Sequence, residues 1–412
     1  MKIKIHKGSH EIGGTCIELE QDGTSVLLDI GQPLKKGSKP ADLGRINPSA
    51  VIISHPHQDH CGLIEKLPVS VPVYCGECAH RLMDASRVFR GLDPLTHDFR
   101  QVWHRRPFQV GPFWITPFLM DHSAVDAFAL LVEAGGKRVL YSGDFRAHGR
   151  KGKLFDWFIR KPPRDIDVLL MEGTMVGTPP RAMETEDQVE EAMWRVFRVQ
   201  KNISFVIASA QNIDRVVSVY RACLKAHKTL VVDQYTAWVL EQVRQTISPN
   251  TPALGWDKLA AFRVTKYTDK INSQPKFFGD FQKLFERCRV FGKTMKAKPQ
   301  MFVSFNRSST AKPILSYVNE SKGPVNVIYS QWSGYLKDDR PDMKLVESLQ
   351  RESGIRFQEM HTGGHASIDD LSAFAQAVDA AKLVPIHSEC VDQFERIFEN
   401  VVRVGDLETI IV

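Results

Sequence analysis

The stretch AVIISHPHQDHCG, from Ala50 to Gly62, most narrows what this chain can fold into. Its apolar half, AVIIS, predicts a buried strand, and the residues that follow predict a loop leading into a short helix. That loop is dense in imidazole and carboxylate side chains, namely His55, His57, Asp59 and His60. We therefore expect a sheet with a cluster of metal-ligand side chains at one of its edges.

Imidazole and carboxylate together suit zinc or a similar divalent ion, which takes about four ligands at roughly 2.0 to 2.2 Å. Four ligand side chains in so short a loop do not converge easily on one ion. His55 and His57 can point one way while Asp59 and His60 point another. Two adjacent metal ions are the simplest solution.

Each metal ion needs further ligands, and the sequence offers them where other apolar runs end. The segments LMDHS, LYSGDFR and LVPIHSE supply His122, Asp144 and His387. If these runs are strands, the three side chains emerge at one rim of a sheet. Asp144 has two oxygens and could bridge two cations.

Length and composition set the broad class. A chain of 412 residues exceeds the usual single core, so we expect two domains or one domain with a large insertion. Hydrophobic residues at 43% and charged residues at 25% are ordinary globular values, and the net charge of +6 favours an anionic partner such as nucleic acid.

The N-terminal sequence and the cysteine content indicate a cellular compartment. The first residues, MKIKIHKGSHEIGG, lack the apolar core of a signal peptide, and no run approaches the ~18 apolar residues needed to cross a bilayer. Seven cysteines, an odd number, suit a reducing compartment. We expect a soluble cytoplasmic protein without a membrane partner. Cys75 and Cys78 have the spacing of half a zinc site or a redox pair, with two buried thiols as the alternative.

The predicted pattern of secondary structure changes along the chain. The first part alternates short apolar runs with glycine-rich turns, which indicates an antiparallel or mixed sheet. From about Glu184, where Thr185 is the expected N-cap of a long helix, helices alternate with strands as in a parallel, Rossmann-like sheet. The last part of the chain again carries histidines beside apolar runs, as the first part does. We therefore expect one domain, residues 1–182 and 345–412, interrupted by an inserted domain, residues 183–344.

These motifs resemble a known family. HPHQDH matches the HxHxDH signature of the metallo-β-lactamase superfamily, and LLDIG, DHS and SGDFR match its other motifs in order. MEGT, TGGHAS and PIHSE resemble the extra motifs of its β-CASP nuclease branch, which includes ribonuclease J and pre-mRNA 3'-end cleavage nucleases. The resemblance covers essentially the whole chain. It implies an α/β fold, an αββα metallo-β-lactamase sandwich interrupted by a Rossmann-like β-CASP domain.

The resemblance also implies roles for the ligand-type residues. Two divalent ions are expected, zinc first and manganese as the alternative. The first set of metal ligands is His55, His57, His122 and Asp144, and the second set is Asp59, His60, Asp144 and His387. Asp29, at the end of SVLLDIG, would orient a ligand from behind.

Catalytic and phosphate-binding residues follow from the same resemblance. Asp59, His365 and Glu172 are the expected catalytic residues, with His365 as general acid backed by the Glu172 carboxylate. His361 has no role in the family pattern. The expected phosphate-binding residues are Ser209, Asn212 and Arg215 of ASAQNIDR, and Gly364 and Ser367 of the GGHAS motif. An ordinary helix cap is the alternative for ASAQNIDR.

The expected activity is hydrolysis of phosphodiester bonds by a two-metal nuclease. His387 favours single-stranded RNA, because DNA-repair members of the branch carry valine at that position, and DNA is the second choice. A small-molecule thioester or lactone hydrolase and a non-catalytic nucleic-acid-binding protein are the alternatives. Gly363 and Ser388 depart from the usual serine and glycine of the branch. The sequence leaves exonuclease or endonuclease action and the oligomeric state open.

Overall fold

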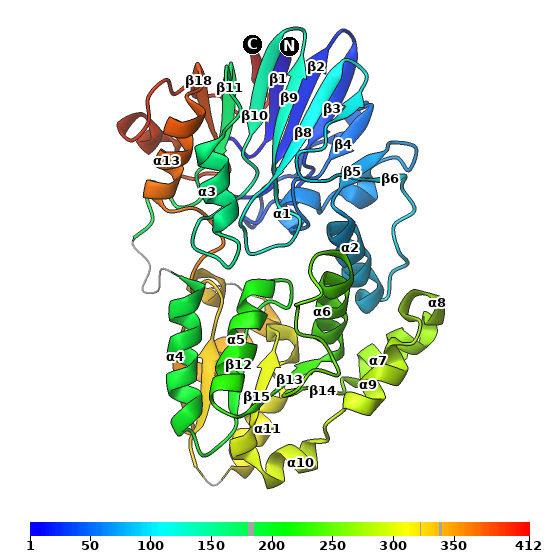
Figure 1. The fold of residues 1–412 in the computed structure, drawn as a ribbon, viewed down its shortest axis with the longest axis vertical. Helices are drawn as coiled ribbons and strands as arrows, with labels where there is room; N and C mark the ends of the chain where they lie inside the picture. The colour runs from blue at the N-terminus through cyan, green and yellow to red at the C-terminus, as the bar shows by residue number, and fades with distance from the viewer. Residues whose placement is uncertain (180–184, 322, 338–339) are drawn as a thin grey trace. The chain divides into compact units, whose positions relative to one another are not determined.

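The computed structural model describes residues 1–179, 185–321, 323–337 and 340–412, and these fall into two compact units (Figure 1). The described part of the first unit comprises 1–83, 95–179 and 364–412, and that of the second comprises 84–94, 185–321, 323–337 and 340–363. The chain thus leaves the first unit and returns to it.

The first sheet of the first unit has the strand order β19-β1-β2-β3-β4-β5-β6. Strands β19, β1, β2 and β3 pair antiparallel, and β3, β4, β5 and β6 pair in parallel. The bounds are β1 (Lys2–Lys7), β2 (Cys16–Gln21), β3 (Thr24–Leu28), β4 (Ala50–Ile52), β5 (Val73–Cys75), β6 (Phe99–Gln101) and β19 (Thr409–Ile411).

The second sheet has the order β18-β11-β10-β9-β8-β7. Strands β7 to β10 form an antiparallel meander, whereas β10, β11 and β18 run in parallel. The bounds are β7 (Phe108–Val110), β8 (Phe113–Leu119), β9 (Phe128–Ala134), β10 (Lys137–Tyr141), β11 (Val168–Glu172) and β18 (Lys382–Ile386). Strands β8, β10, β11 and β18 therefore share one direction, and their carboxyl ends reach the same edge of the sheet.

The two sheets pack face to face. Their inner faces form one continuous core, to which the first sheet contributes Ile5 and Leu28 and the second contributes Leu130 and Val168, all fully buried. A second cluster lies between the outer face of the second sheet and two helices, α3 (Lys153–Arg160) and α13 (Ile368–Val378). A third covers the outer face of the first sheet. The expected αββα sandwich is confirmed.

The second unit holds a six-stranded, fully parallel sheet of order β14-β13-β15-β12-β16-β17. Its strands are β12 (Ser204–Ile207), β13 (Thr229–Asp233), β14 (Leu259–Phe262), β15 (Phe302–Asn306), β16 (Val325–Tyr329) and β17 (Ile355–Glu359). Helices alternate with these strands, so the expected Rossmann-like alternation of helices and parallel strands is confirmed. They are α4 (Glu186–Val199), α5 (Ile213–Lys225), α6 (Gln234–Thr246), α7 (Thr265–Ser273), α8 (Pro275–Phe278), α9 (Phe281–Cys288), α10 (Gly292–Ala297), α11 (Pro313–Glu320) and α12 (Pro341–Gln350).

The boundaries of the insertion differ from those expected. The expected change between residues 182 and 183 lies outside the described residues. The return to the first unit comes at Gly364 instead of residue 345, because β17 pairs along its whole length with β16. The second unit also includes 84–94, at the end of α2 (Glu77–Arg90), since Phe89 packs edge to face against Tyr235 and Tyr267.

A stack of phenylalanines fixes α3 and α13 on the second sheet. Phe374 of α13 is fully buried, with its ring 4.9 Å from that of Phe158 on α3 and 4.6 Å from that of Phe145. We expect Phe374→Ala to lower the free energy of unfolding by about 3 to 5 kcal/mol, because a large cavity would open among these rings. Denaturant unfolding measures this. The exposed Gln376→Ala on the same helix should change stability by less than about 0.5 kcal/mol, and equal effects of the two variants would contradict the packing argument.

Candidate metal centre

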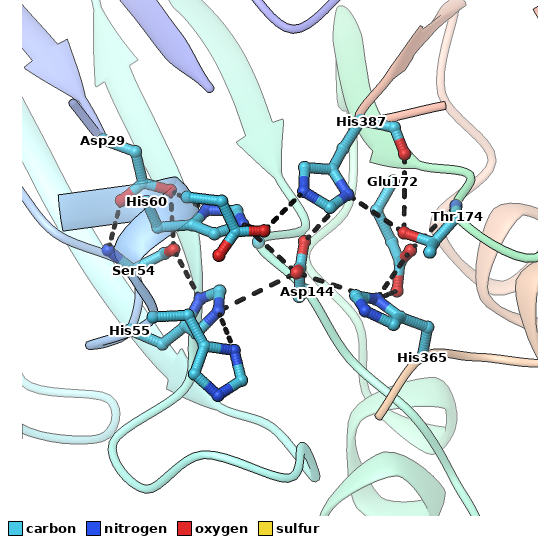
Figure 2. Close-up of polar contacts among 12 residues, drawn as sticks. Asp29, Ser54, His55, His60, Asp144, Glu172, Thr174, His365 and His387 are labelled. Carbon is cyan, nitrogen blue, oxygen red and sulfur yellow. Dashed lines mark hydrogen bonds and ion pairs between the residues drawn. The ribbon is translucent and has the colours of Figure 1, made fainter. Parts of the chain in front are cut away.

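The candidate site lies at the edge where the strands of the first unit end (Figure 2). Asp29 follows β3, and the ligand-rich loop follows β4 and passes into the short helix α1 (Gln58–Cys61). His122, Asp144, Glu172 and His387 come at or just after the ends of β8, β10, β11 and β18. Because these strands point the same way, side chains far apart in sequence meet here.

Three imidazoles form the first group of candidate ligands. His57 Nδ1 lies 3.2 Å from His55 Nε2 and 3.3 Å from His122 Nε2. Ligand atoms of a tetrahedral zinc ion at roughly 2.0 to 2.1 Å would be separated by about 3.3 Å. The three nitrogens are therefore spaced as ligands of one ion.

The second group is centred on Asp144. Asp144 Oδ2 lies 3.1 Å from His60 Nε2, and Asp59 Oδ2 lies 3.3 Å from His387 Nε2. Asp144 Oδ2 is also 3.8 Å from His55 Nε2, so this carboxylate lies between the two groups (Figure 2). The candidate ligands therefore form two groups, one of three imidazoles and one of two imidazoles with a carboxylate, and Asp144 lies between them.

Unsatisfied buried atoms test whether this donor set fits a cation. Among the described residues, both carboxylate oxygens of Asp144 and His60 Nε2 are buried without a hydrogen bond. The 3.1 Å contact between Asp144 and His60 has an ion-pair distance but not hydrogen-bond geometry. Buried polar atoms without partners are costly, and a divalent ion would satisfy all three. The histidine and aspartate clusters therefore fit a divalent metal site.

The protonation states of three candidate ligands agree with a cation site, whereas burial lowers the pKa of His60 but Asp144 and Asp29 outweigh it and hold that pKa well above its usual value. Burial lowers the pKa of His55 and of His122 well below the ordinary value, and neighbouring imidazoles lower both further. Burial raises the pKa of Asp144, but the adjacent His387 and His60 outweigh it and hold the pKa well below its usual range. The ligand-competent forms, neutral imidazole and ionised carboxylate, are thus the favoured ones at these three positions.

Asp29 lies behind the ligands. It is fully buried and accepts hydrogen bonds from the Ser54 backbone and hydroxyl and from the Tyr141 hydroxyl. His60 Nδ1 lies 2.7 Å from Asp29 Oδ2, so His60 Nδ1 carries the proton and Nε2 remains free to bind a cation.

Two residues that sequence reasoning missed fix further imidazoles. Ser54 donates to Asp29, so its oxygen can accept from His55 Nδ1 at 3.1 Å. The Thr174 hydroxyl lies 3.0 Å from His387 Nδ1 and donates to the His387 carbonyl at 3.4 Å. Both contacts leave the Nε2 atom of the histidine available. The only sequence signal was position, since Ser54 precedes the ligand loop and Thr174 closes the MEGT motif.

His365 and Glu172 lie beside Asp144. His365 Nδ1 is 3.3 Å from both oxygens of Glu172 and 3.6 Å from Asp144 Oδ2. The Glu172 carboxylate is buried and accepts from the Phe145 and Thr174 backbone amides. Burial lowers the pKa of His365, but the charges of Glu172 and Asp144 outweigh it, so the net pKa is above the usual value. This pair can hold a proton next to the clustered ligands.

The five expected phosphate-binding residues are divided between the two units. Gly364 packs closely against the first group of candidate ligands. A Cβ atom added at this position would lie 2.7 Å from Ser123 Oγ and 3.3 Å from His122 Cε1. Ser367 is the N-cap of α13, where its hydroxyl accepts from the Asp370 amide. In the second unit Ser209 is exposed, and Asn212 caps α5 by accepting from the Arg215 amide.

Arg215 is fully buried within the second unit. Its guanidinium donates to both oxygens of Glu186 and to the carbonyls of Ser330 and Thr362, and it lies 3.1 Å from His361 Nδ1. This arrangement ties α4 and α5 to the chain that follows β16 and β17. Binding a substrate phosphate would require the cluster to open.

We expect Arg215→Met to lower the free energy of unfolding by about 3 to 5 kcal/mol, because it leaves the Glu186 carboxylate buried without its partner. Arg221→Met on the same helix is the matched control, since Arg221 is half-exposed and its partner Glu190 keeps a second cation, Lys225 at 2.7 Å. Urea unfolding of both variants measures the difference. Unchanged stability of Arg215→Met together with weakened RNA binding would contradict the structural role.

The structure also bears on the cysteine pair and on membrane-spanning segments. Cys75 and Cys78 are both buried, and none of the metal-type clusters found among the described residues includes either. Within the part of the chain that the structure describes, no helix is long and apolar enough to cross a membrane.

Parts or all of this chain are similar to known proteins. Residues 11–195 match the metallo-β-lactamase superfamily. Ribonuclease J of Helicobacter pylori (strain B128) is 22% identical over 94% of this chain and 56% of its own length. An RNase J-like protein of Methanocaldococcus jannaschii is 25% identical over 84% of this chain and 81% of its own. The chain thus spans little more than half the length of the H. pylori relative.

A solved structure shares the fold of the whole chain. The crystal structure of a protein of unknown function from Enterococcus faecalis V583 covers 100% of this chain and 99% of its own, with a TM-score of 0.79 at 18% identity. At that identity the likeness shows the fold alone.

Proposed function

We propose that this chain is a metal-dependent nuclease that hydrolyses phosphodiester bonds of single-stranded RNA, as a member of the ribonuclease J-like β-CASP branch of the metallo-β-lactamase superfamily. The observation that carries the proposal is the meeting of two ligand groups at Asp144, with the pair of His365 and Glu172 beside them. Metal ligands and a proton-holding pair at one point are what phosphodiester hydrolysis needs.

Two metal ions are proposed, zinc first and manganese as the alternative. His55, His57, His122 and Asp144 would hold one ion. Asp59, His60, Asp144 and His387 would hold the other. Divalent ions in these positions supply Lewis acidity, which lowers the pKa of water and offsets charge on the scissile phosphate.

The chain's own residues do the rest of the chemistry. Glu172 holds His365 through Nδ1 and favours its protonated form, so that the Nε2 proton is the one available to the departing oxygen. Asp29, Ser54 and Thr174 keep His60, His55 and His387 in the tautomers that leave Nε2 free. Asp59 is proposed in both roles, as a metal ligand and as a catalytic residue, and its Oδ2 lies 3.3 Å from Nε2 of His387, a ligand of the same proposed ion.

RNA is proposed as the substrate on two grounds. His387 is present where DNA-repair members of the branch carry valine, and the relatives named above are ribonuclease J and an RNase J-like protein. The net charge of +6 suits a polyanionic substrate.

The test incubates the purified protein with end-labelled single-stranded RNA and Mn²⁺ or Zn²⁺. We expect metal-dependent cleavage by the wild type and none by Asp59→Ala with His60→Ala. Asp59→Asn, a nearly isosteric change, covers the case in which the double variant does not fold. RNA carrying a 5'-monophosphate or a 5'-triphosphate distinguishes release of mononucleotides from internal cleavage.

DNA of the same sequence and a small thioester are run in parallel. Turnover of the thioester with no cleavage of either nucleic acid would overturn the proposal, as would cleavage that survives the loss of Asp59 and His60. Tight RNA binding without any cleavage would identify a non-catalytic protein.

A further inference from the structure

A pocket of about 340 Å³ lies on the first unit, between the end of β8 and α3. Its size falls in the range of small-ligand sites. It is separate from the ligand clusters described above, and the proposed chemistry uses none of its residues. The lining residues are His104, Arg105, Phe118, Leu119, Leu154, Trp157, Phe158, Arg160 and Lys161.

The floor of the pocket is aromatic. The rings of Phe118 and Phe158 meet edge to face at 5.5 Å, and the ring of His104 lies edge-on to Phe118 at 6.4 Å. The side chain of Trp157 is 60% exposed, although Phe155 and Phe158 on either side of it are buried. A large aromatic side chain left open beside an apolar floor offers a flat surface on which a planar ring can stack.

The rim of the pocket is cationic. Arg105, Arg160 and Lys161 are all exposed, and the lining contains no carboxylate. No ion pair found among the described residues includes any of these three side chains. Three cations without acidic partners around a stacking surface favour a ligand that has both a planar ring and a negative charge.

The pocket is also close to the candidate metal centre along the chain. Leu119 belongs to the lining, and its backbone amide donates to His104 Nδ1 at 2.9 Å. His122 follows three residues later, a span of at most about 11 Å. The Lys151 ammonium, in the loop before α3, donates to the His122 carbonyl. Neighbouring nucleotides of one strand could therefore reach both places.

We propose that this pocket is an accessory RNA-binding subsite, in which a base stacks on Trp157 and the adjoining phosphates contact Arg105, Arg160 and Lys161. The inference deepens the proposed function and rests on RNA being the substrate. The pocket would hold a nucleotide away from the scissile bond, and so contribute to strand affinity without taking part in the chemistry.

The test measures the dissociation constant of fluorescent single-stranded RNA by anisotropy, with divalent ions chelated so that no cleavage occurs. Trp157→Ala should raise the constant about tenfold through loss of one stacking contact. Trp114→Ala is the aromatic control, because Trp114 is 50% exposed on the same strand as Phe118 but does not line the pocket. It should have little effect.

Charge is tested by Arg105→Gln with Arg160→Gln. This pair of changes should weaken binding and reduce the slope of log affinity against log salt concentration by about 1.4, or 0.7 for each lost phosphate contact. The control with the same change in net charge is Lys66→Gln with Arg396→Gln, two exposed cations outside the lining. Its slope should stay near that of the wild type.

Turnover of bis(4-nitrophenyl) phosphate with Mn²⁺ separates this inference from the proposed function. That substrate is too small to occupy both places, so the pocket variants should hydrolyse it at the wild-type rate. One contrary result is that the wild type and all variants hydrolyse bis(4-nitrophenyl) phosphate while the pocket variants bind RNA as tightly as the wild type. That result would overturn the subsite and leave the proposed nuclease activity standing. Equal loss of affinity for an acidic peptide would show that the pocket binds charge rather than nucleotides, and would also overturn it.

Discussion

Asp144→Asn is expected to lower kcat/KM for RNA cleavage at least about a thousandfold, or about 4 kcal/mol of transition-state stabilisation. The substitution keeps the size of the side chain but removes the charge between His55, His60 and His387. The same variant should retain less divalent metal after dialysis. Elemental analysis alongside steady-state kinetics measures both effects.

Asp126→Asn is the matched control for this change. Asp126 is also a buried aspartate of the first unit, but its carboxylate accepts from the Ala79 amide and it belongs to none of the metal-type clusters of the described chain. We expect this variant to keep its metal and its activity while losing some stability. Full metal content and full activity in Asp144→Asn would contradict the placement of Asp144 between the ligand groups.

His365→Gln is expected to slow RNA cleavage by about 10² to 10⁴, the usual contribution of a positioned general acid. The loss should depend on the leaving group. The ribose oxygen of RNA is a poor leaving group and needs a proton, whereas 4-nitrophenolate leaves without one. Hydrolysis of bis(4-nitrophenyl) phosphate should therefore fall far less than cleavage of RNA.

Glu172→Gln tests the partner in this pair. It should give a smaller loss with the same dependence on the leaving group, since His365 remains but without the carboxylate at 3.3 Å. Metal content should be unchanged in His365→Gln. Equal losses on both substrates, or loss of metal, would indicate that His365 acts as a ligand or a structural residue.

The sequence could predict the parts of this fold that depend on local patterns. Apolar runs that end in His122, Asp144 or His387 are strands, and parallel strand ends bring these side chains together. The N-cap at Thr185 is confirmed, with its hydroxyl accepting from the Gln188 amide in a capping box. Such features need only a few neighbouring residues to be recognised.

Other features depend on pairing between distant segments, which local patterns do not encode. β17 belongs to the parallel sheet of the second unit because it pairs with β16, and no residue pattern within the segment Ile355–Glu359 predicts that partner. Arg215 looked like a phosphate ligand in sequence, but Glu186, on another helix, holds its guanidinium. The sequence does not distinguish the exposed Trp157 from the buried Phe155 and Phe158 near it either.

The most direct measurement of the central claim is RNA cleavage as a function of the ratio of metal to protein. Starting from metal-free protein, additions of Zn²⁺ or Mn²⁺ are followed by both cleavage rate and bound metal. The two ligand groups that share Asp144 predict that activity rises to a plateau at two ions per chain and that Asp144→Asn reaches no such plateau. A plateau at one ion, or cleavage that proceeds without added metal, would contradict the account.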